Sequence, residues 1–216
     1  MPEVIVQNLP FLLQGLWTTI DLSLWSILGG TALGILLATI RFVRVPALGT
    51  LCMLFIEFIR GTPLLVVLLI TYFALPALFG YKTTAYSAAL LGFVLFIGAY
   101  LAEDFRAGLR SVRPSLIQAG LATGLNRWQV LRFIIAPQAV RSVIPPVFNQ
   151  YIRLIKFTSV ASIIGVTDLT GAALLVNARQ FYPITILTTI ALTYFVLCYV
   201  LSLIGRALYA HYAVKM

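Results

Sequence analysis

Long runs of uncharged, apolar residues are the feature of this sequence that most restricts its fold. A helix needs about 20 such residues to cross the ~30 Å hydrocarbon core of a membrane. Four runs approach or exceed that length: Leu22–Ile40, which Phe11–Ile20 extends, Gly61–Tyr81, Thr83–Ala102 and Phe181–Gly205. With 61% hydrophobic and only 10% charged residues, the chain also differs from soluble domains in composition. A soluble globular enzyme is therefore excluded.

A fifth apolar region, Ser142–Ala178, is interrupted by the charged residues Arg153, Lys156 and Asp168. The region can therefore hold only one further crossing. We place this crossing at about Ala136–Phe157, which brings the predicted number of transmembrane helices to five.

Two apolar segments are too short to cross the membrane and too apolar to be ordinary loops. Val45–Ile56 precedes the second span, and we interpret it as an interfacial helix that leads into that span. Residues 158–179 follow the fourth span. We interpret them as a re-entrant segment on the outer side that lines or gates a pathway.

The distribution of Lys and Arg predicts the orientation of the spans, because short cytoplasmic loops collect these residues. With the N-terminus outside, only Lys82 and Arg179 fall clearly on the outer side. Ten basic residues fall inside: Arg41, Arg44, Arg106, Arg110, Arg113, Arg127, Arg132, Arg141, Arg206 and Lys215.

The sequence thus predicts an all-α membrane protein with five transmembrane helices, its N-terminus outside and its C-terminus inside. We expect an external N-terminal segment (residues 1–14), a single transmembrane domain (15–208) and a cytoplasmic tail (209–216). His211 is expected to be a solvated residue of that tail. The basic residues form no dense patch, so a nucleic-acid partner is not expected.

The longest inside segment, Glu103–Arg141, contains a regular apolar pattern and should fold. The pattern predicts a short cytoplasmic helix after Pro114 and a turn at Gly124 and Asn126. So short a helix is marginal alone in water and must pack against something. Two interpretations stay open: the helix lies against its own membrane helices, or it projects into a groove on a cytoplasmic partner.

Four ordered motifs carry a resemblance to a known family. Ser111–Ala139 resembles the "EAA" coupling loop of bacterial ABC importer permeases. The other three, which resemble the polar amino-acid branch of that family, are Phe55–Val66, Ala99–Leu109 and Leu154–Gly165.

The resemblance implies a permease subunit in the plasma membrane of a bacterium. Its implied partners are two cytoplasmic ATPase subunits, a second permease subunit, identical or homologous, and an external substrate-binding protein. The residues implied to couple to the ATPase are Ser115, Gln118, Ala119, Gly120, Gly124 and Leu125. Gln118 replaces the acidic residue of the motif and cannot make a charge-assisted contact. Coupling by shape is therefore the expectation.

The sequence contains no G-x-x-x-x-G-K-[ST] loop, so the usual nucleotide pocket is missing and ATP hydrolysis is expected in another polypeptide. One His, no cluster of acids and no Cys/His array predict neither a metal site nor a cofactor. Cys52 and Cys198 are isolated in apolar stretches and are predicted to be buried free thiols.

The candidate residues for the pathway or the substrate lie after the middle of the fourth span. Lys156 could attract a carboxylate, but it could also extend toward the membrane surface or pair with Asp168. Thr158 and Ser159 could cap the short helix that follows, as broken helices in transporters do.

Three charged residues near the inner ends of the second and third spans, Glu57, Arg60 and Glu103, are candidates for structural pairs or gate contacts. Glu57 and Arg60 are three residues apart and should share a helix face. Gly30 and Gly34 form a pair of small residues four apart, which predicts close helix packing.

The best-supported function is therefore that of a permease subunit in an ATP-driven importer for polar amino acids, with no covalent catalysis of its own. An ion-coupled secondary carrier or channel for small polar solutes is the alternative. It would need acids inside the membrane, whereas Glu57 and Glu103 are expected near the boundary. An intramembrane enzyme is disfavoured because no acid–base pair is evident.

Overall fold

The computed structural model of the chain describes residues 2–43 and 46–212, and every regular element in these residues is helical. The α-helices are α1 (Pro2–Val43), α2 (Pro46–Gly61), α3 (Leu64–Leu69), α4 (Leu75–Phe79), α5 (Ala85–Arg110), α6 (Pro114–Ala122), α7 (Arg127–Val130), α8 (Ala136–Phe157), α9 (Leu169–Gln180) and α10 (Pro183–Tyr212). Two π-helical turns, Ile70–Ala74 and Leu131–Ile135, and a 3₁₀-helix, Thr158–Ile164, join some of them. The predicted all-α fold is confirmed.

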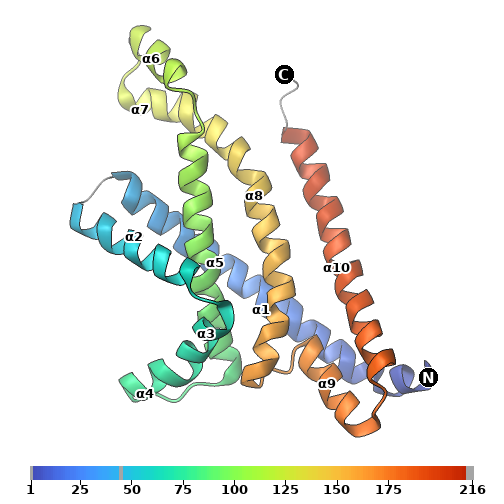
Figure 1. The fold of residues 1–216 in the computed structure, drawn as a ribbon. Helices are drawn as coiled ribbons and strands as arrows, with labels where there is room; N and C mark the ends of the chain where they lie inside the picture. The colour runs from blue at the N-terminus through green and yellow to red at the C-terminus, as the bar shows by residue number, and fades with distance from the viewer. Residues whose placement is uncertain (1, 44–45, 213–216) are drawn as a thin grey trace.

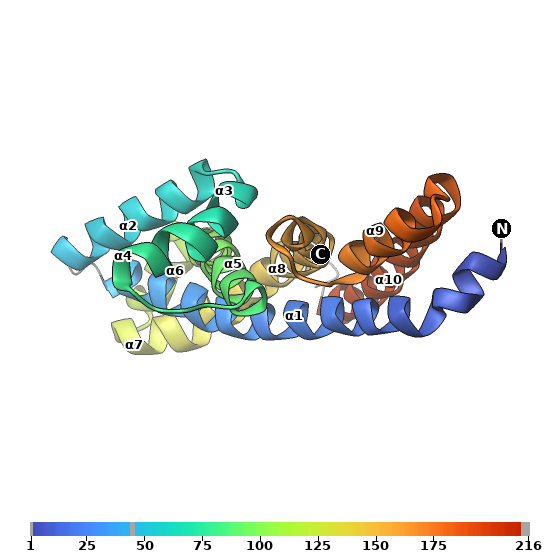
Figure 2. The ribbon, with the colours of Figure 1, turned by 90° about the horizontal axis from the view of Figure 1, so that it is seen from below.

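The long helices run between two ends of the molecule. In Figure 1, α5, α8 and α10 extend from one end to the other, and α1 crosses them obliquely. Figure 2 shows α1 along one side of the molecule, with α2, α3, α8 and α9 above it in this view and α7 below it. The α6–α7 segment and the C-terminal end of α10 lie at the same end, whereas the N-terminus, α4 and α9 lie at the other (Figure 1). This arrangement agrees with the alternation of spans expected from the sequence.

Four stretches of the described residues are long and apolar enough to cross a membrane: Glu3–Val43, Ala85–Arg110, Arg127–Ile164 and Pro183–Ala207. A fifth candidate is a bent pair, in which the helix direction changes by 112° between α2 and the helices from Leu64 to Phe79. The predicted five spans are therefore found when the bent pair is counted as one crossing.

The second span differs from the single helix Gly61–Tyr81 that the sequence predicted. The break follows Gly61, because Pro63 disfavours a helical backbone at Thr62 and itself has an extended conformation (φ −56°, ψ 138°). The helix predicted at Val45–Ile56 is found for the described residues and extends to Gly61, whereas its interfacial position stays a prediction. These residues form part of α2, the first arm of the bent pair, which packs against α1 and α5.

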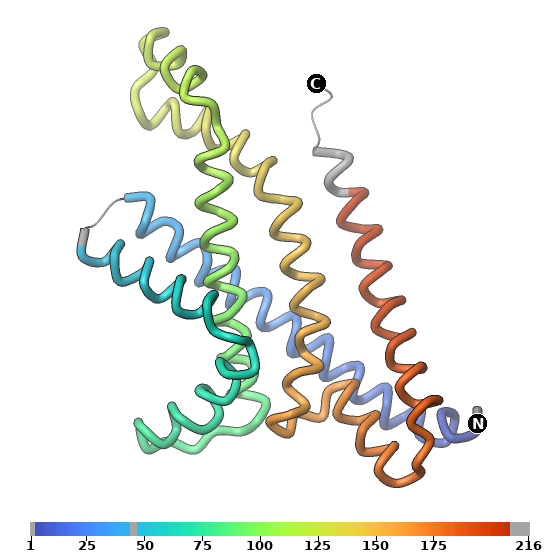
Figure 3. Tube along the Cα trace, in the orientation of Figure 1, coloured from blue at the N-terminus to red at the C-terminus, as the bar shows by residue number. Residues whose placement is uncertain are grey.

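The fourth span has the predicted bounds, because α8 runs from Ala136 to Phe157. The chain then continues as a 3₁₀-helix that ends at Gly165, which has a left-handed backbone (φ 93°). Figure 3 shows the chain turning between α8 and α9. Helix α9 returns beside α1 and α10. The predicted re-entrant segment therefore folds back on the helices, and its depth in the membrane stays a prediction.

The two ends of the chain are more helical than expected. Helix α1 begins at Pro2, so residues 2–14 of the predicted external segment are continuous with the first span. Within it, Asn8 Nδ2 donates to Gln180 Oε1 at 3.2 Å and ties this end to α9. Helix α10 continues to Tyr212, so it includes part of the predicted tail 209–216, whose last four residues lie outside the described residues.

Helices α1 and α5 approach closely at the predicted glycine pair. A Cβ atom on Gly34 would lie 2.8 Å from the Cβ of Leu101 and 3.1 Å from the backbone oxygen of Gly98. At Gly30 the corresponding neighbour is Ile97. The packing role predicted for Gly30 and Gly34 is confirmed, since only a residue without a side chain leaves room for α5.

Both cysteines lie in helices. Cys52 belongs to α2 and Cys198 to α10, and both are buried and unbridged. The prediction of buried free thiols is confirmed.

Candidate functional site

The short helix α6 projects at one end of the molecule between α5 and α7 (Figure 1). Pro114 occupies its first turn, where the missing N–H costs no helical hydrogen bond. The helix ends before Gly124, whose φ of 86° is left-handed. There the N–H of Leu125 donates to the carbonyl oxygen of Gly120 at 3.2 Å and closes the end of the helix. The predicted helix and turn are confirmed.

The buried position of α6 is Gly120, which faces Ile134 and Val130. Helix α6 therefore rests on α7 and on the π-helical turn that follows it. Helix α7 begins with a reciprocal cap: Gln129 N donates to Asn126 Oδ1 at 2.9 Å, and Asn126 N donates to Gln129 Oε1 at 2.8 Å. The α6–α7 segment is thus a small folded unit, not a flexible loop.

The predicted coupling residues fall into two groups. Four of them, Ser115, Gln118, Ala119 and Gly124, are exposed on the surface. The other two, Gly120 and Leu125, contribute to the packing of the segment itself. Large apolar side chains beside the exposed group are also uncovered, among them Leu121 (46% exposed) and Trp128 (66%). Because α6 packs mainly on α7 and the π-helical turn that follows it, the opposite face of α6 is exposed.

Helix α7, the π-helical turn and α8 continue into one another from Arg127 to Ile164 without a gap. Helix α6 packs against the start of this helical stretch. The same stretch contains three of the candidate pathway residues, Lys156, Thr158 and Ser159, whereas Asp168 lies outside it.

Helix α8 has a polar face whose side chains are exposed on the surface of the chain. Asn149, Arg153 and Lys156 are exposed and stand four and three residues apart, which places them on one side of the helix. Among the described residues, neither cation forms an ion pair. Lys156 was predicted from the sequence, whereas Asn149 and Arg153 were missed; their helical spacing to Lys156 was the signal that could have found them.

The predicted capping role of Thr158 and Ser159 is wrong. Thr158 is buried and donates back to the carbonyl oxygen of Ile155 at 2.8 Å, and Ser159 donates back to that of Lys156 at 2.7 Å. The first residue of the 3₁₀-helix has no side-chain cap. Both hydroxyls therefore stabilise the end of α8, and no free helix N-terminus is presented there.

Asp168 is a structural residue in this conformation. It is fully buried, and its carboxylate accepts from the N–H of Gly171 at 2.9 Å and from the hydroxyl of Tyr194 at 3.0 Å. The first bond caps α9, and the second ties α9 to α10. The alternative in which Lys156 pairs with Asp168 is wrong, because the two partners of this carboxylate are a backbone amide and a tyrosine.

An Asp168→Ala variant should be less stable by about 2–4 kcal/mol, because it removes a helix cap and the charge-assisted hydrogen bond from the partly buried hydroxyl of Tyr194. Asp168→Asn should lose less than half of that, since an amide oxygen can still cap α9. Thermal unfolding of the purified variants in detergent measures both values. Equal stability of the alanine variant and the wild type would contradict this role.

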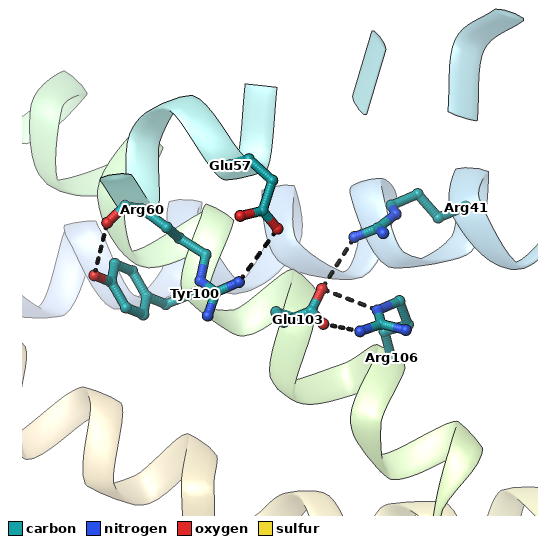
Figure 4. A network of polar contacts seen from close by, with 6 residues as sticks. All are labelled: Arg41, Glu57, Arg60, Tyr100, Glu103 and Arg106. Carbon is teal, nitrogen blue, oxygen red and sulfur yellow. Dashed lines mark hydrogen bonds and ion pairs between the residues drawn. The ribbon is translucent and has the colours of Figure 1, made fainter. Parts of the chain in front are cut away.

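Two of the three predicted charged residues form the expected pair (Figure 4). Arg60 Nη1 lies 3.5 Å from Glu57 Oε1 at the end of α2. The guanidinium group also lies over the ring of Tyr100, 5.5 Å from its centre, and the hydroxyl of Tyr100 donates to the backbone oxygen of Arg60 at 3.4 Å. Through Arg60 the pair thus connects α2 to α5, and its role as a structural pair or a gate contact stays a prediction.

Glu103 forms a separate cluster with residues that the sequence did not assign to it (Figure 4). Arg41 Nη1 of α1 donates to Glu103 Oε2 at 3.0 Å, and Arg106 Nε donates to the same oxygen at 2.9 Å. Arg106 follows Glu103 by three residues, so spacing could have indicated that contact. The contact with Arg41 joins α1 to α5 at the end nearest α6.

Comparisons with known proteins agree with this architecture. Residues 30–214 match the family model described as "Binding-protein-dependent transport system inner membrane component". The probable glutamine ABC transporter permease protein GlnP of Bacillus subtilis (strain 168) is 37% identical over 207 residues, which cover 94% of each chain. The glutamine transport system permease protein GlnP of Escherichia coli (strain K12) is 36% identical over 93% of this chain and 92% of its own.

A solved structure has nearly the same fold. It is titled "Crystal structure of an amino acid ABC transporter with histidines", and the two chains superpose with a TM-score of 0.91 at 28% identity. The match covers 96% of each chain.

Proposed function

The chain belongs to the family of binding-protein-dependent transport system inner membrane components, and on that premise we propose that it provides the translocation pathway for polar amino acids in an ATP-driven importer. Relatives that are named as glutamine permeases support this substrate class. The chain has no nucleotide-binding loop, so the energy comes from separate ATPase subunits.

The observation that carries the proposal is the packing of α6 against the helical stretch that leads into α8. The exposed side of α6 docks on the ATPase, and Gly120 and Leu125 hold α6 on α7. When the ATPase subunits close on ATP, they move α6, and the continuous helix from α7 to α8 carries that movement into the membrane. Access to the pathway then alternates between the two sides.

The proposed assembly contains two ATPase subunits, a second permease subunit and an external substrate-binding protein in the plasma membrane of a bacterium. The α6–α7 segment faces the cytoplasm and the N-terminus faces outward, as the excess of basic residues at the α6 end favours. Gln118 is exposed and uncharged, so the contact with the ATPase relies on shape and neutral hydrogen bonds.

The polar face of α8 lines the pathway in this proposal, where Arg153 and Lys156 attract the carboxylate of the substrate. Replacing either residue with glutamine should lower the transport rate at saturating loaded binding protein roughly tenfold, since a charge-assisted hydrogen bond contributes about 1.5–3 kcal/mol. Lys82→Gln, an exposed lysine between α4 and α5, is the matched control and should leave the rate unchanged. Wild-type rates in both α8 variants would remove these residues from the pathway.

Reconstitution tests the function itself. Proteoliposomes that contain the permease, its ATPase subunits and the binding protein should accumulate labelled glutamine only when ATP is present on the α6 side. Omitting the ATPase should abolish the uptake, and an ionophore that collapses ion gradients should not. Uptake by the permease alone, driven by an ion gradient, would overturn the proposal in favour of a secondary carrier.

A further inference from the structure

A basic pocket lies between the ends of α1 and α5 that are nearest to α6. Its volume is about 320 Å³, and its lining residues are Arg41, Phe42, Arg106, Leu109 and Arg110. One carboxylate, that of Glu103, pairs with Arg41 and Arg106. Arg110 forms no ion pair in the described part of the chain. The three arginines therefore leave an excess of positive charge in the pocket.

The basic pocket adjoins a larger apolar groove between α1, α5 and α8. The groove has a volume of about 610 Å³ and an almost wholly apolar lining, to which Ile35, Val140 and Phe148 contribute. Phe42 and Leu109 line both the groove and the basic pocket, so the two spaces share a wall. An occupant of both would have a negatively charged head and an apolar chain.

We propose that an anionic phospholipid occupies this site, with its phosphate held by the arginines and one acyl chain in the groove. Guanidinium groups bind phosphate oxygens in pairs of parallel hydrogen bonds, which suits this head group. Basic pockets between membrane helices on the cytoplasmic side are suited to anionic lipid head groups. The inference rests on the proposed function for the orientation that places α6 and the arginines at the inner leaflet.

A second copy of the chain is a poorer occupant than a lipid. The chain carries 15 Lys and Arg residues against 6 Asp and Glu, so its surface offers few negative groups to an arginine pocket.

Leu131 and Ala139 also line the groove and belong to the helical stretch on which α6 rests. A bound lipid would therefore touch both α1 and the part of the protein that carries the coupling movement.

Native mass spectrometry of the full chain in detergent tests the site, with phosphatidylglycerol and phosphatidylcholine of identical acyl chains as probes. Phosphatidylglycerol should bind at least fivefold more tightly. Arg110→Gln should remove most of that preference, because Arg110 has no carboxylate partner in the described structure. Arg127→Gln, which changes an exposed arginine of α7 outside the pocket, is the control and should keep the preference.

A groove variant separates a lipid from a free phosphate. Val140→Trp fills the groove and should weaken phosphatidylglycerol binding at least fivefold while leaving the three arginines in place. Equal binding of the two lipids would overturn the proposal. It would also be overturned if millimolar inorganic phosphate competed fully with phosphatidylglycerol and Val140→Trp did not change that competition. A change of oligomeric state in Val140→Trp would assign the groove to a second copy instead. Because no ATPase is present, these results do not depend on whether ATP-driven transport is observed.

Discussion

A Gly34→Leu variant is expected to lose the contact between α1 and α5 and most of its stable fold. A Cβ atom at this position would meet the backbone oxygen of Gly98 at 3.1 Å and the Cβ of Leu101 at 2.8 Å, neither of which can rotate away. Leucine adds three further carbons to that clash. Overpacking of this kind costs about 3 kcal/mol, at the upper end of the usual range, because two long helices must separate.

Gly49→Leu is the matched control for this prediction. Gly49 lies inside α2, and a Cβ atom there would meet nothing within 4 Å. The control adds the same side chain at a glycine that has room for it, so its unfolding temperature in detergent should stay close to that of the wild type. If the two leucine variants unfold at the same temperature, close packing at Gly34 does not hold the fold together.

A Gly124→Val variant is expected to lower ATP-dependent transport at least tenfold while the membrane helices remain folded. Gly124 has a φ of 86°, which costs a residue with a side chain about 2 kcal/mol and a β-branched residue most of all. A Cβ atom there has open space, so the strain acts on the turn and not on packing. The end of α6 and its position on α7 should therefore change, and transport should fall at least tenfold.

Gly124→Asn separates strain from bulk, because asparagine tolerates the left-handed backbone better than other residues with side chains. This variant should retain most of the transport rate in proteoliposomes, and both variants should show wild-type unfolding in detergent. Full transport by Gly124→Val would show that the shape of this turn does not matter for coupling.

Hydropathy predicted where the chain crosses but not how each crossing is built. The bounds of α8 agree with the prediction because the uncharged run between Arg141 and Arg153 located the crossing, and α8 extends only a few residues beyond each end of that run. The bend between α2 and α3 was not predicted, since Gly61, Thr62 and Pro63 are uncharged and do not interrupt the run. The effect of Pro63 on Thr62 is local and could have been weighed from the sequence.

Contacts between distant residues could not be predicted. The pairing of Glu57 with Arg60 follows from spacing on one helix, whereas that of Glu103 with Arg41 depends on how α1 packs against α5. The close packing of these helices was itself indicated by Gly30 and Gly34. Sequence patterns therefore predicted which residues share a helix face, whereas the partners on other helices depend on tertiary packing.

Asp168 illustrates the same limit at the candidate site. In the sequence it interrupts an apolar run and resembles a pathway residue. Its burial and its bonds to Gly171 and Tyr194 arise only when α9 folds back against α1 and α10. The exposed face of α8, in contrast, follows from helical spacing alone, which is why Arg153 could have been assigned together with Lys156.

The most direct test of the account is a crosslink from α6 to the ATPase. Ala119 is exposed on α6, and a single cysteine there, in a chain with Cys52→Ala and Cys198→Ala, gives one reactive thiol in the permease. A short bifunctional reagent should join this thiol to an ATPase subunit in the assembled transporter, and a membrane-impermeant maleimide should reach it only from the ATPase side. Labelling from the opposite side, with no crosslink to an ATPase, would contradict the claim that α6 couples ATP hydrolysis to the pathway.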